Sequence, residues 1–412
     1  MATVPSKISF TLLLLIISFI LSAQNEWITV SGVVKDSKTR SRIANAAISV
    51  RGIAMGTVSN VDGEFIFKIP TSFQNDSFSI SHITYETKAL PVLAYINKGN
   101  TIFLTAHIAQ LSEIQVNPAD PKQVVKLAFQ KIKQNYSKSP NLMTAFYRES
   151  VRQRRKYISI TEALVKISKA SYSNTRDDAV SILKGRKGVN VSKADTLNVL
   201  LQGGPKVLLY IDVPKNPALG LALINWDNYR FTYAHPVSID GRPHYAIDFT
   251  PAKTLSDPLY NGSIYIDQQN FSIARVEFSL DISDEQKAAE MLIQKKPNDL
   301  IFVPMETKYL ANFKYQDNRY YLNYLRFDVK FKSDWKRKLF KNTYTIISEM
   351  AITQIEDTIA TKIPFAQRFK SNMILHNEVS AFYDADFWGP YNIIEPEESI
   401  ENAIKRLTRK MN

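Results

Sequence analysis

The second half of the chain contains long segments in which apolar and polar residues alternate. Between residues 271 and 280, Ala274, Val276 and Phe278 occupy every second position, and charged or hydroxyl residues stand between them. This period of two residues is typical of β-strands that bury one face. Residues 262–267 precede this segment by a short turn, so the two segments predict a β-hairpin, which is a unit of an antiparallel sheet.

The same pattern continues along the chain. A second hairpin is predicted from residues 306–315 and 319–331, joined by a turn at Gln316-Asp317-Asn318. Further strands are predicted at residues 206–213, 229–234, 244–249 and 344–353. Consecutive antiparallel hairpins favour a curved or nearly closed sheet with helices packed on it. We therefore expect residues 137–395 to form an antiparallel β domain of half-barrel shape, in a protein that is mainly β with some α+β character.

Two helices are predicted beside this sheet. Residues 117–136 form a linker and a helix, with Asp120 as the N-cap and Pro121 at the first helical position. Ser283 and Gln286 have the spacing of a capping box, which predicts the start of the second helix.

The two ends of the chain lie outside these domains. Residues 1–23 have the pattern of a signal peptide, because Lys7 precedes the apolar run 8–21 and small residues follow it; cleavage would leave Gln24 as the new N-terminus. The alternative is a permanent anchor, but this run is shorter than the roughly 20 residues that span a bilayer. Residues 396–412 predict a C-terminal amphipathic helix, which could dock on the sheet or lie on an anionic membrane. We therefore expect an exported protein, in the periplasm or associated with the outer membrane.

Residues 24–116 consist of short β-runs separated by turn residues. Strands are predicted at residues 28–35, 47–51, 56–59, 65–69, 78–83 and 101–105. The tight turn at Asn60-Val61-Asp62-Gly63 needs a residue with positive φ, which Gly63 adopts without steric cost. We take Gly56, Asp62 and Gly63 as structural turn residues. Strands at this spacing predict a small all-β sandwich.

These N-terminal residues carry a family resemblance. The motifs are Ser31-Gly32-Val33-Val34-Lys35-Asp36, Ala46 to Val50, Gly56 to Phe65, Ile80 to Glu86 and Leu111 to Val116. In this order they resemble the carboxypeptidase regulatory-like domain, although Thr84 stands where that family usually has Gly. The resemblance implies a transthyretin-like β-sandwich, found at the N-termini of many outer-membrane receptors and other envelope proteins. It implies location and architecture rather than catalysis.

The C-terminal domain carries two further resemblances. The hairpin of residues 262–267 and 271–278 resembles a stretch of LolA-type lipoprotein carriers, whose incomplete β-barrel holds acyl chains in an apolar cup. The motifs at residues 145–149, 348–350 and 387–389, taken with the regulatory-like module, resemble uncharacterised Gram-negative envelope proteins with no known activity.

Composition excludes several classes of chemistry. The 412 residues contain no cysteine, which excludes disulfides, Cys-ligated zinc and thiol catalysis, and the five histidines show no zinc-binding spacing. We expect no metal and no cofactor. The net charge is +13, and for an exported protein this favours anionic lipids or polysaccharides over nucleic acid as partners. Asp240, His244 and Asp248 lie around one predicted strand, where they could form either an acid–base pair or a surface hydrogen bond.

The best candidate ligand-binding segment is rich in aromatic residues and carboxylates. Tyr383, Asp384, Asp386 and Trp388 would suit sugar stacking or a calcium site. The alternative is a loop that Phe387 and Trp388 pin to the core, because aromatic side chains are seldom exposed.

These observations favour a non-catalytic, exported cell-envelope protein. Its ligand would be an apolar or glycan-bearing envelope molecule, held in the cup of the C-terminal sheet. The partners expected are an envelope lipid, a lipoprotein or a glycan, with peripheral membrane contact. The alternative is an interaction module that docks on an outer-membrane protein assembly. A third hypothesis, less favoured, is a glycan hydrolase that uses Asp384 or Asp386. A closed, filled barrel would leave no room for a ligand, whereas a half-barrel would.

Overall fold

The structure is a computed structural model of the whole chain. It describes residues 27–50, 53–97, 99–107, 120–154, 156–189, 200–201, 204–216, 225–253, 255, 257–295, 300–335, 342–356, 362–381 and 387–396. The predicted signal peptide and, beyond Pro396, the predicted C-terminal helix lie outside the described residues.

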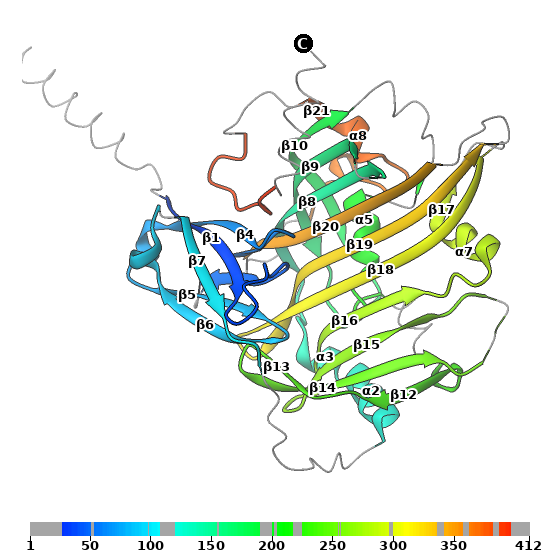
Figure 1. The fold of residues 1–412 in the computed structure, drawn as a ribbon, viewed down its shortest axis with the longest axis horizontal. Coiled ribbons are helices and arrows are strands. Elements are labelled where there is room, and N and C mark those ends of the chain that lie inside the picture. Colours follow the sequence, from blue (N-terminus) through cyan, green and yellow to red (C-terminus); the bar gives the residue numbers. More distant parts are fainter. Residues whose placement is uncertain are drawn as a thin grey trace, which may run out of the picture.

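The N-terminal strands form two sheets packed face to face (Figure 1). One sheet has the order β4-β1-β7 and the other has the order β3-β2-β5-β6. The elements are β1 (Trp27–Asp36), β2 (Ala47–Val50), β3 (Gly56–Val58), β4 (Glu64–Pro70), η1 (Thr71–Phe73), β5 (Ser77–His82), β6 (Tyr85–Pro91), η2 (Val92–Tyr95) and β7 (Gly99–Leu104). Side chains from both sheets, including Val30, Phe67 and Phe78, share one buried core. The predicted sandwich is confirmed. Strand β6 was not predicted, because most of its residues are exposed and do not alternate.

The turn between β3 and β4 forms as expected. The side-chain oxygen of Asn60 accepts hydrogen bonds from the backbone N–H groups of Asp62 and Glu64, at 2.9 and 2.8 Å. Gly63 has a φ of 71°, and a Cβ there would lie 2.6 Å from the carbonyl oxygen of Val34. Gly56, however, lies within β3 rather than in a turn, and its own constraint is close packing against the backbone of β2.

Most of the other described strands form one long, twisted sheet (Figure 1). Its twelve strands have the order β12-β14-β15-β16-β18-β19-β20-β8-β9-β10-β21, with β13 paired to β14. They are β8 (Asn141–Gln153), β9 (Lys156–Lys169), β10 (Ala179–Val189), β12 (Tyr229–Tyr233), β13 (Val237–Ile239), β14 (Arg242–Pro251), β15 (Tyr260–Asp267), β16 (Ile273–Leu280), β18 (Leu300–Gln316), β19 (Arg319–Trp335), β20 (Asn342–Glu356) and β21 (Ser380–Ala381). Two short strands, β11 (Leu200–Leu201) and β17 (Ile293–Lys295), pair with each other separately. The predicted antiparallel sheet is therefore confirmed, although the short strand β21 pairs in parallel with β10.

The helices lie beside the sheet. They are α2 (Pro121–Gln130), α3 (Ile132–Asn135), α5 (Gly204–Leu208), η3 (Leu209–Ile211), η4 (Trp226–Asn228), α7 (Glu285–Leu292), η5 (Phe365–Gln367) and α8 (Leu375–Glu378). Asp120 caps α2 as predicted, by accepting a hydrogen bond from the N–H of Lys122. Two predictions were wrong. Residues 206–213, predicted as a strand, lie in α5, η3 and a turn, and the N-cap of α7 is Asp284 rather than Ser283.

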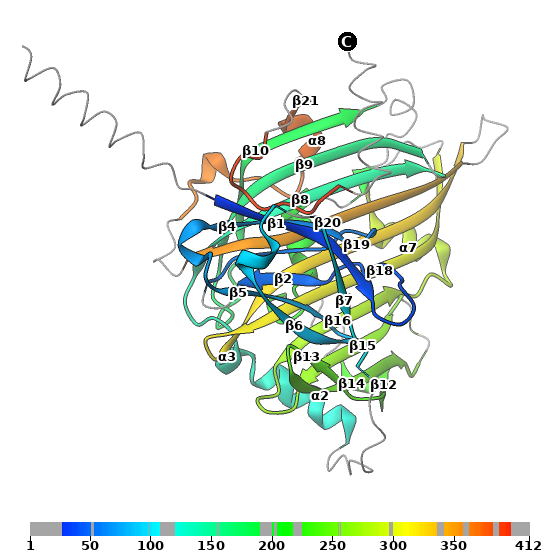
Figure 2. The same cartoon turned by 60° about the vertical axis from the view of Figure 1, so that its left-hand side comes forward.

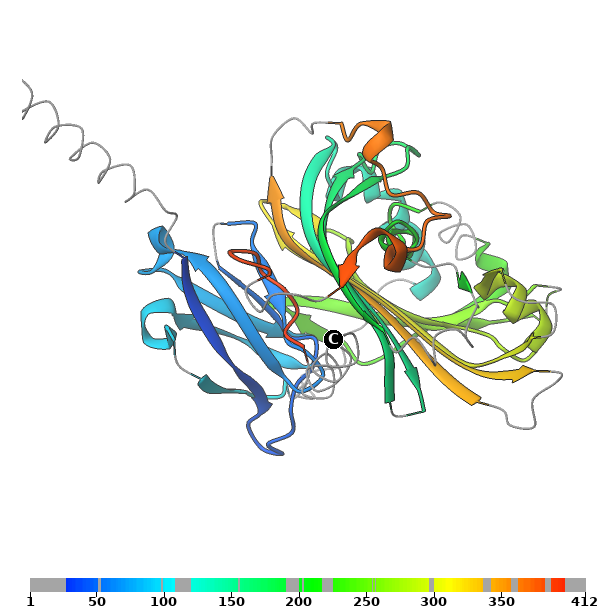
Figure 3. The ribbon, with the colours of Figure 1, turned by 90° about the horizontal axis from the view of Figure 1, so that it is seen from above.

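The concave face of the sheet carries the main hydrophobic core. Figure 3 shows the helices gathered on this face and the sandwich on the opposite, convex face. Apolar residues from α2, α5 and η3 pack there against alternate residues of the strands, such as Ala145, Tyr147 and Val165. A smaller core under α7 includes Phe302, Val329 and Phe331. None of the described helices is long and apolar enough to cross a membrane.

A C-terminal segment, residues 387–394, runs between the sandwich and the convex face; we call it the strap. Figure 2 shows the sandwich in front of the large sheet, near the middle of the strand order. Backbone atoms join the two domains, because Ile355 of β20 donates a hydrogen bond to the carbonyl oxygen of Ala54 at 2.9 Å. Val58 of β3, Phe146 and Leu164 of the sheet, and Trp388 and Ile394 of the strap share one buried cluster. The two domains are therefore packed together through side chains and backbone.

Candidate functional site

Two adjoining pockets lie between the sandwich and the convex face of the large sheet, and we call them together the interdomain cleft. Both pockets are lined by Ser49 of β2, Lys314 of β18 and Asn323 of β19. They contain about 330 and 510 Å³ of empty space, part of it open to solvent. Strands far apart in the sequence meet here, so the cleft exists only because the sandwich packs on the sheet.

A β-bulge turns polar side chains towards the cleft. The register between β18 and β19 shifts where Asn312 pairs with Tyr324 and Phe313 pairs with Leu322, so Asn323 is the extra residue. A bulge of this kind re-aims a side chain and bends its strand. On β18, Ala311 and Phe313 point into the concave core, which leaves the alternate residues on the convex face, under the sandwich.

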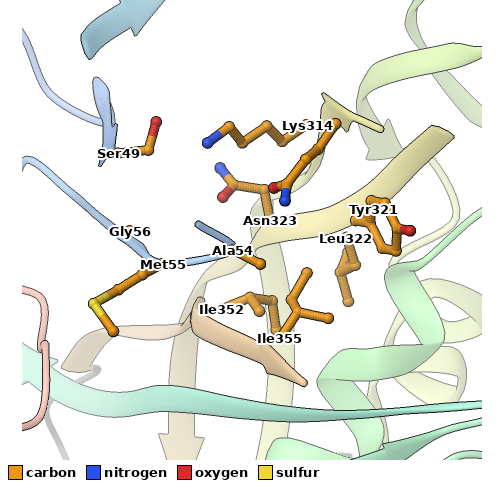
Figure 4. Close-up of a pocket in the computed structure, with 11 residues that line it drawn as sticks. Ser49, Ala54, Met55, Gly56, Lys314, Tyr321, Leu322, Asn323, Ile352 and Ile355 are labelled. Atoms are coloured by element: carbon orange, nitrogen blue, oxygen red, sulfur yellow. The ribbon is translucent and has the colours of Figure 1, made fainter. Parts of the chain in front are cut away.

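The cleft has an apolar end and a polar end. Figure 4 shows Leu322, Ile352 and Ile355 around Ala54, with the side chains of Lys314 and Asn323 nearer to Ser49. The polar end continues into the second pocket, which adds Asn45, Ser81, His82, Asp240, Arg275 and Asn312 to its lining. Hydroxyl, amide and charged groups thus meet in one half-buried space.

Lys314 is the basic side chain of the cleft that has no partner among the described residues. Its side chain is half-buried, and within the described part of the chain it makes no hydrogen bond or ion pair. Burial lowers the pKa of Lys314, and the carboxylate of Asp240 opposes this only in part. An ammonium group without a full counter-charge is costly to hold away from water.

The other two basic residues of the cleft are engaged or neutral. Arg275 bonds to the carboxylate of Glu277, and its Nη1 donates to Asn312 Oδ1 at 2.8 Å. Burial, together with the positive charge of Arg275, lowers the pKa of His82 to about 4. His82 is therefore uncharged at neutral pH, and its Nδ1 lies 3.1 Å from the hydroxyl of Thr84. Lys314 and Arg275 provide the positive charge of the cleft.

The aromatic segment predicted as a ligand site is only partly described. Tyr383, Asp384 and Asp386 lie outside the described residues. Trp388 is 4% exposed, and its ring meets that of Phe146 edge to face at 5.4 Å between centroids. The structure therefore places Trp388 in a core contact, which agrees with the pinned-loop alternative rather than with a ring open to a sugar.

The three residues around the predicted strand at 244–249 have separate contacts. His244 is fully buried, with Nδ1 2.8 Å from the carbonyl oxygen of Arg242 and Nε2 3.2 Å from the hydroxyl of Tyr320. Burial lowers the pKa of His244. Asp248 accepts a hydrogen bond from Ser263, and Asp240 lines the interdomain cleft instead. The acid–base interpretation has no hydrogen bond between His244 and Asp248 to support it among the described contacts.

Sequence reasoning missed the residues of the cleft. Lys314 and Arg275 were visible only as polar positions of alternating strands, and nothing local distinguishes a strand face that a second domain covers from one that faces water. The extra residue at Asn323 was also hidden, because the alternation on either side of it is regular. Among the described residues, no cluster of three or more acidic or histidine side chains could hold a metal ion.

Several solved structures are similar to this chain over its larger part. A LolA superfamily protein from Nitrosomonas europaea is 11% identical, with 59% of this chain and 98% of that chain covered, at a TM-score of 0.22. A putative outer membrane lipoprotein-sorting protein domain from Vibrio parahaemolyticus is 9% identical, with 59% and 95% covered, at 0.27. MucB in complex with MucA(peri) is 10% identical, with 58% and 96% covered, at 0.18. Identities and TM-scores this low allow no conclusion about function.

The comparison by family is more specific for the N-terminal domain. No curated protein matches the chain. Residues 30–116 match the family described as the CarboxypepD_reg-like domain. The match begins in β1 and extends beyond β7, so it includes the whole of the sandwich apart from the first residues of β1. The resemblance that the N-terminal motifs carry is thereby confirmed, and the sandwich is a CarboxypepD_reg-like domain.

Proposed function

We propose that this protein is a non-catalytic, exported component of the bacterial cell envelope that binds a glycan-bearing ligand in the interdomain cleft. The predicted signal peptide, the basic net charge and the CarboxypepD_reg-like domain support the location. The observation that carries the binding role is the group of Ser49, Lys314 and Asn323, which face one half-buried space from both domains.

The lining of the cleft favours a polar ligand over an acyl chain. Sugars are bound by side-chain amides, hydroxyls and charged groups placed beside apolar contacts. The cleft offers amides from Asn45 and Asn323, hydroxyls from Ser49 and Ser81, and an apolar wall at Leu322. The concave face, which the sequence favoured as an acyl-binding cup, is instead packed with core side chains over the described residues.

The geometry of the histidines supports a non-catalytic role. A general base must lie within hydrogen-bond reach of the proton it removes, in a site that the substrate can enter. His244 is fully buried and held by two hydrogen bonds, and His82 in the cleft lies beside Arg275 with its pKa near 4. Neither has the setting of a base that works at neutral pH.

The test begins with native mass spectrometry of the mature chain, purified from a periplasm without detergent. We expect a co-purifying glycan-bearing molecule at near-unit stoichiometry. Asn323→Trp fills the cleft and should abolish its retention, whereas Lys332→Trp, at an exposed position of the same strand, should not. A clean apo mass and no glycan binding by the wild-type chain would overturn the proposal. A co-purifying protein in place of a glycan would favour docking on a protein assembly.

A further inference from the structure

We infer that the interdomain cleft recognises an acidic glycan, with the ammonium group of Lys314 binding the negatively charged group of the sugar. This inference rests on the proposed function, because it names the class of ligand for the same cleft. The negative group would be a phosphate or a carboxylate, which present the same charge-bearing oxygens to a lysine.

The charges around the cleft have the sign that an anion requires. Lys314 and Arg275 line it, Asp240 is the acidic residue among the described lining, and His82 is neutral at physiological pH. Asp240 influences Lys314 electrostatically, yet no ion pair within 4.0 Å joins them. The guanidinium of Arg275 is held by Glu277 and Asn312. Lys314 is therefore the cation of the lining whose ammonium has no partner among the described residues.

Burial makes this arrangement favourable for an anion. In a half-buried cleft the effective dielectric constant is lower than in water, so opposite charges attract more strongly. The same burial lowers the pKa of Lys314, because the protonated form lacks a close counter-charge. A bound phosphate or carboxylate would supply that counter-charge. A neutral sugar would leave the ammonium group of Lys314 without a close counter-charge.

The groups beside Lys314 fit the rest of a sugar. Figure 4 shows the side chains of Lys314 and Asn323 near Ser49, at the polar end of the cleft. Amides and hydroxyls of this kind can both donate hydrogen bonds to sugar hydroxyls and accept hydrogen bonds from them. The ammonium group of Lys314 can only donate, so it binds acceptor oxygens. Arg275, fixed by its own partners, adds to the positive potential without having to move. Lys314 would therefore bind the negative group of the ligand, and the amide and hydroxyl side chains would bind the sugar hydroxyls.

The test compares three soluble probes by titration calorimetry on the mature full-length protein. N-acetylglucosamine 1-phosphate and glucuronic acid carry the two negative groups, and N-acetylglucosamine carries none. We expect at least one acidic probe to bind about tenfold more tightly than the neutral one, since one charge-assisted hydrogen bond accounts for such a factor. Which acidic probe binds better distinguishes phosphate from carboxylate. Rising salt should weaken this preference only modestly, because a half-buried charge pair is screened less than an exposed one.

The decisive variant is Lys314→Gln. It should lower the affinity for the acidic probe to that for the neutral probe. Lys308→Gln is the matched control, because it removes an exposed lysine from the same strand, away from the cleft. Thermal melting establishes that both variants are folded. Equal affinity for the three probes, or an acidic preference that survives Lys314→Gln, overturns the inference while glycan binding still stands. Binding of none of the probes overturns the inference, and the cleft-filling variant then decides the proposed function separately.

Discussion

Arg148 is a buried, charged residue of the large sheet that is paired with two carboxylates. It is 2% exposed, and its guanidinium bonds to Glu162 at 2.8 Å and to Glu349 at 3.3 Å. Its Nη2 also donates to the carbonyl oxygen of Ile394 in the strap at 2.6 Å. One side chain therefore connects strands β8, β9 and β20 with the C-terminal segment that lies over them.

We predict that Arg148→Met destabilises the protein by about 3–5 kcal/mol, because Glu162 and Glu349 would lose a buried partner. Urea denaturation followed by circular dichroism measures the change. Arg230→Met, at an exposed position on strand β12, should change the free energy of unfolding by about 0.5 kcal/mol or less. A loss below about 1 kcal/mol for Arg148→Met would mean that the ion pairs are not buried as described.

Asp267, which is buried, and Glu149, which is half-buried, should respond to acid in opposite directions. Burial alone would raise the pKa of Asp267, but hydrogen bonds from Arg242 and Tyr320 lower it below its usual value. The pairing of Asp267 therefore contributes stability at neutral pH, which is lost as pH falls through the folded pKa. Burial raises the pKa of Glu149, and hydrogen bonds from Tyr147 and Gly204 offset this only in part. The charge on Glu149 therefore costs stability at neutral pH, and this cost disappears on protonation.

Two isosteric variants test this prediction, because each removes one of the two carboxylates with little change in shape. The free energy by which wild type exceeds Asp267→Asn should shrink as pH is lowered from neutral towards about 3, where a free carboxylate is protonated. The difference between wild type and Glu149→Gln should instead move in favour of wild type over the same range. Denaturant titrations at several pH values measure both. Parallel slopes for the two variants would contradict the assigned environments.

The strap is the element that ties the sandwich to the sheet. The amide of Asn392 accepts a hydrogen bond from the N–H of Lys68 at 2.7 Å and donates to its carbonyl oxygen at 3.0 Å. Thr57 of β3 donates to the carbonyl oxygen of Ile393 at 2.8 Å. Asn392 thus acts on β4 as a neighbouring strand would, with one donor and one acceptor.

Asn392→Ala should therefore free the backbone of Lys68 and loosen the strap. We expect a loss of about 1–2 kcal/mol, since two half-buried backbone groups of Lys68 would lose the side chain that bonds to them. Hydrogen exchange should show faster exchange at the Lys68 amide, with the amides of β1 unchanged. Tyr391→Ala alters an exposed neighbour and serves as the control. Unchanged protection at Lys68 in Asn392→Ala would show that the strap does not hold β4.

The elements that the sequence predicted well share one property, which is one buried and one exposed face. Strands β15, β16, β18 and β19 alternate because core side chains and helices cover their concave face, whereas the sandwich leaves parts of their convex face in water (Figure 3). Strands β8 to β10 were not predicted as strands, because β8 and β9 are buried on both faces over much of their length and therefore do not alternate. Residues 206–213 are apolar and short, and a run of this kind reads equally as a strand or a buried helix.

At the scale of the whole molecule, the sandwich and the large sheet have separate cores and a shared seam. The sandwich core lies between its own two sheets, and the large sheet buries its concave face under helices. The seam between them is the cluster that Val58, Phe146 and Trp388 share, flanked by the interdomain cleft. The alternation of apolar and polar residues indicates which face of a strand is buried. It does not indicate which part of the polar face a second domain will cover. This is why the fold class was predictable and the cleft was not.

The absence of cysteine from the natural chain allows a direct test of the seam. Met55 and Gln354 face each other as an antiparallel bridge between the sandwich and β20. Cα atoms of such partners lie about 4.5–5.5 Å apart, within the range of a disulfide. The double variant Met55→Cys/Gln354→Cys should therefore oxidise rapidly within one molecule.

The crosslinked protein distinguishes a fixed seam from domains that open and close. If the cleft binds its ligand in the arrangement described, the oxidised double variant should keep the affinity of its reduced form for the acidic glycan probe. Mass spectrometry and mobility on non-reducing gels follow the disulfide, and calorimetry follows binding. The pair Asp62→Cys/Gln354→Cys is the control, because Asp62 lies in the turn beside Arg42, away from the bridge, and should not crosslink. Slow oxidation of the first pair would mean that the sandwich and β20 are not held together as described. Loss of binding once the disulfide has formed would mean that the domains must separate to admit a ligand. Retained affinity would mean that the cleft is preformed, so that the sandwich acts as a fixed wall of the site rather than as a lid.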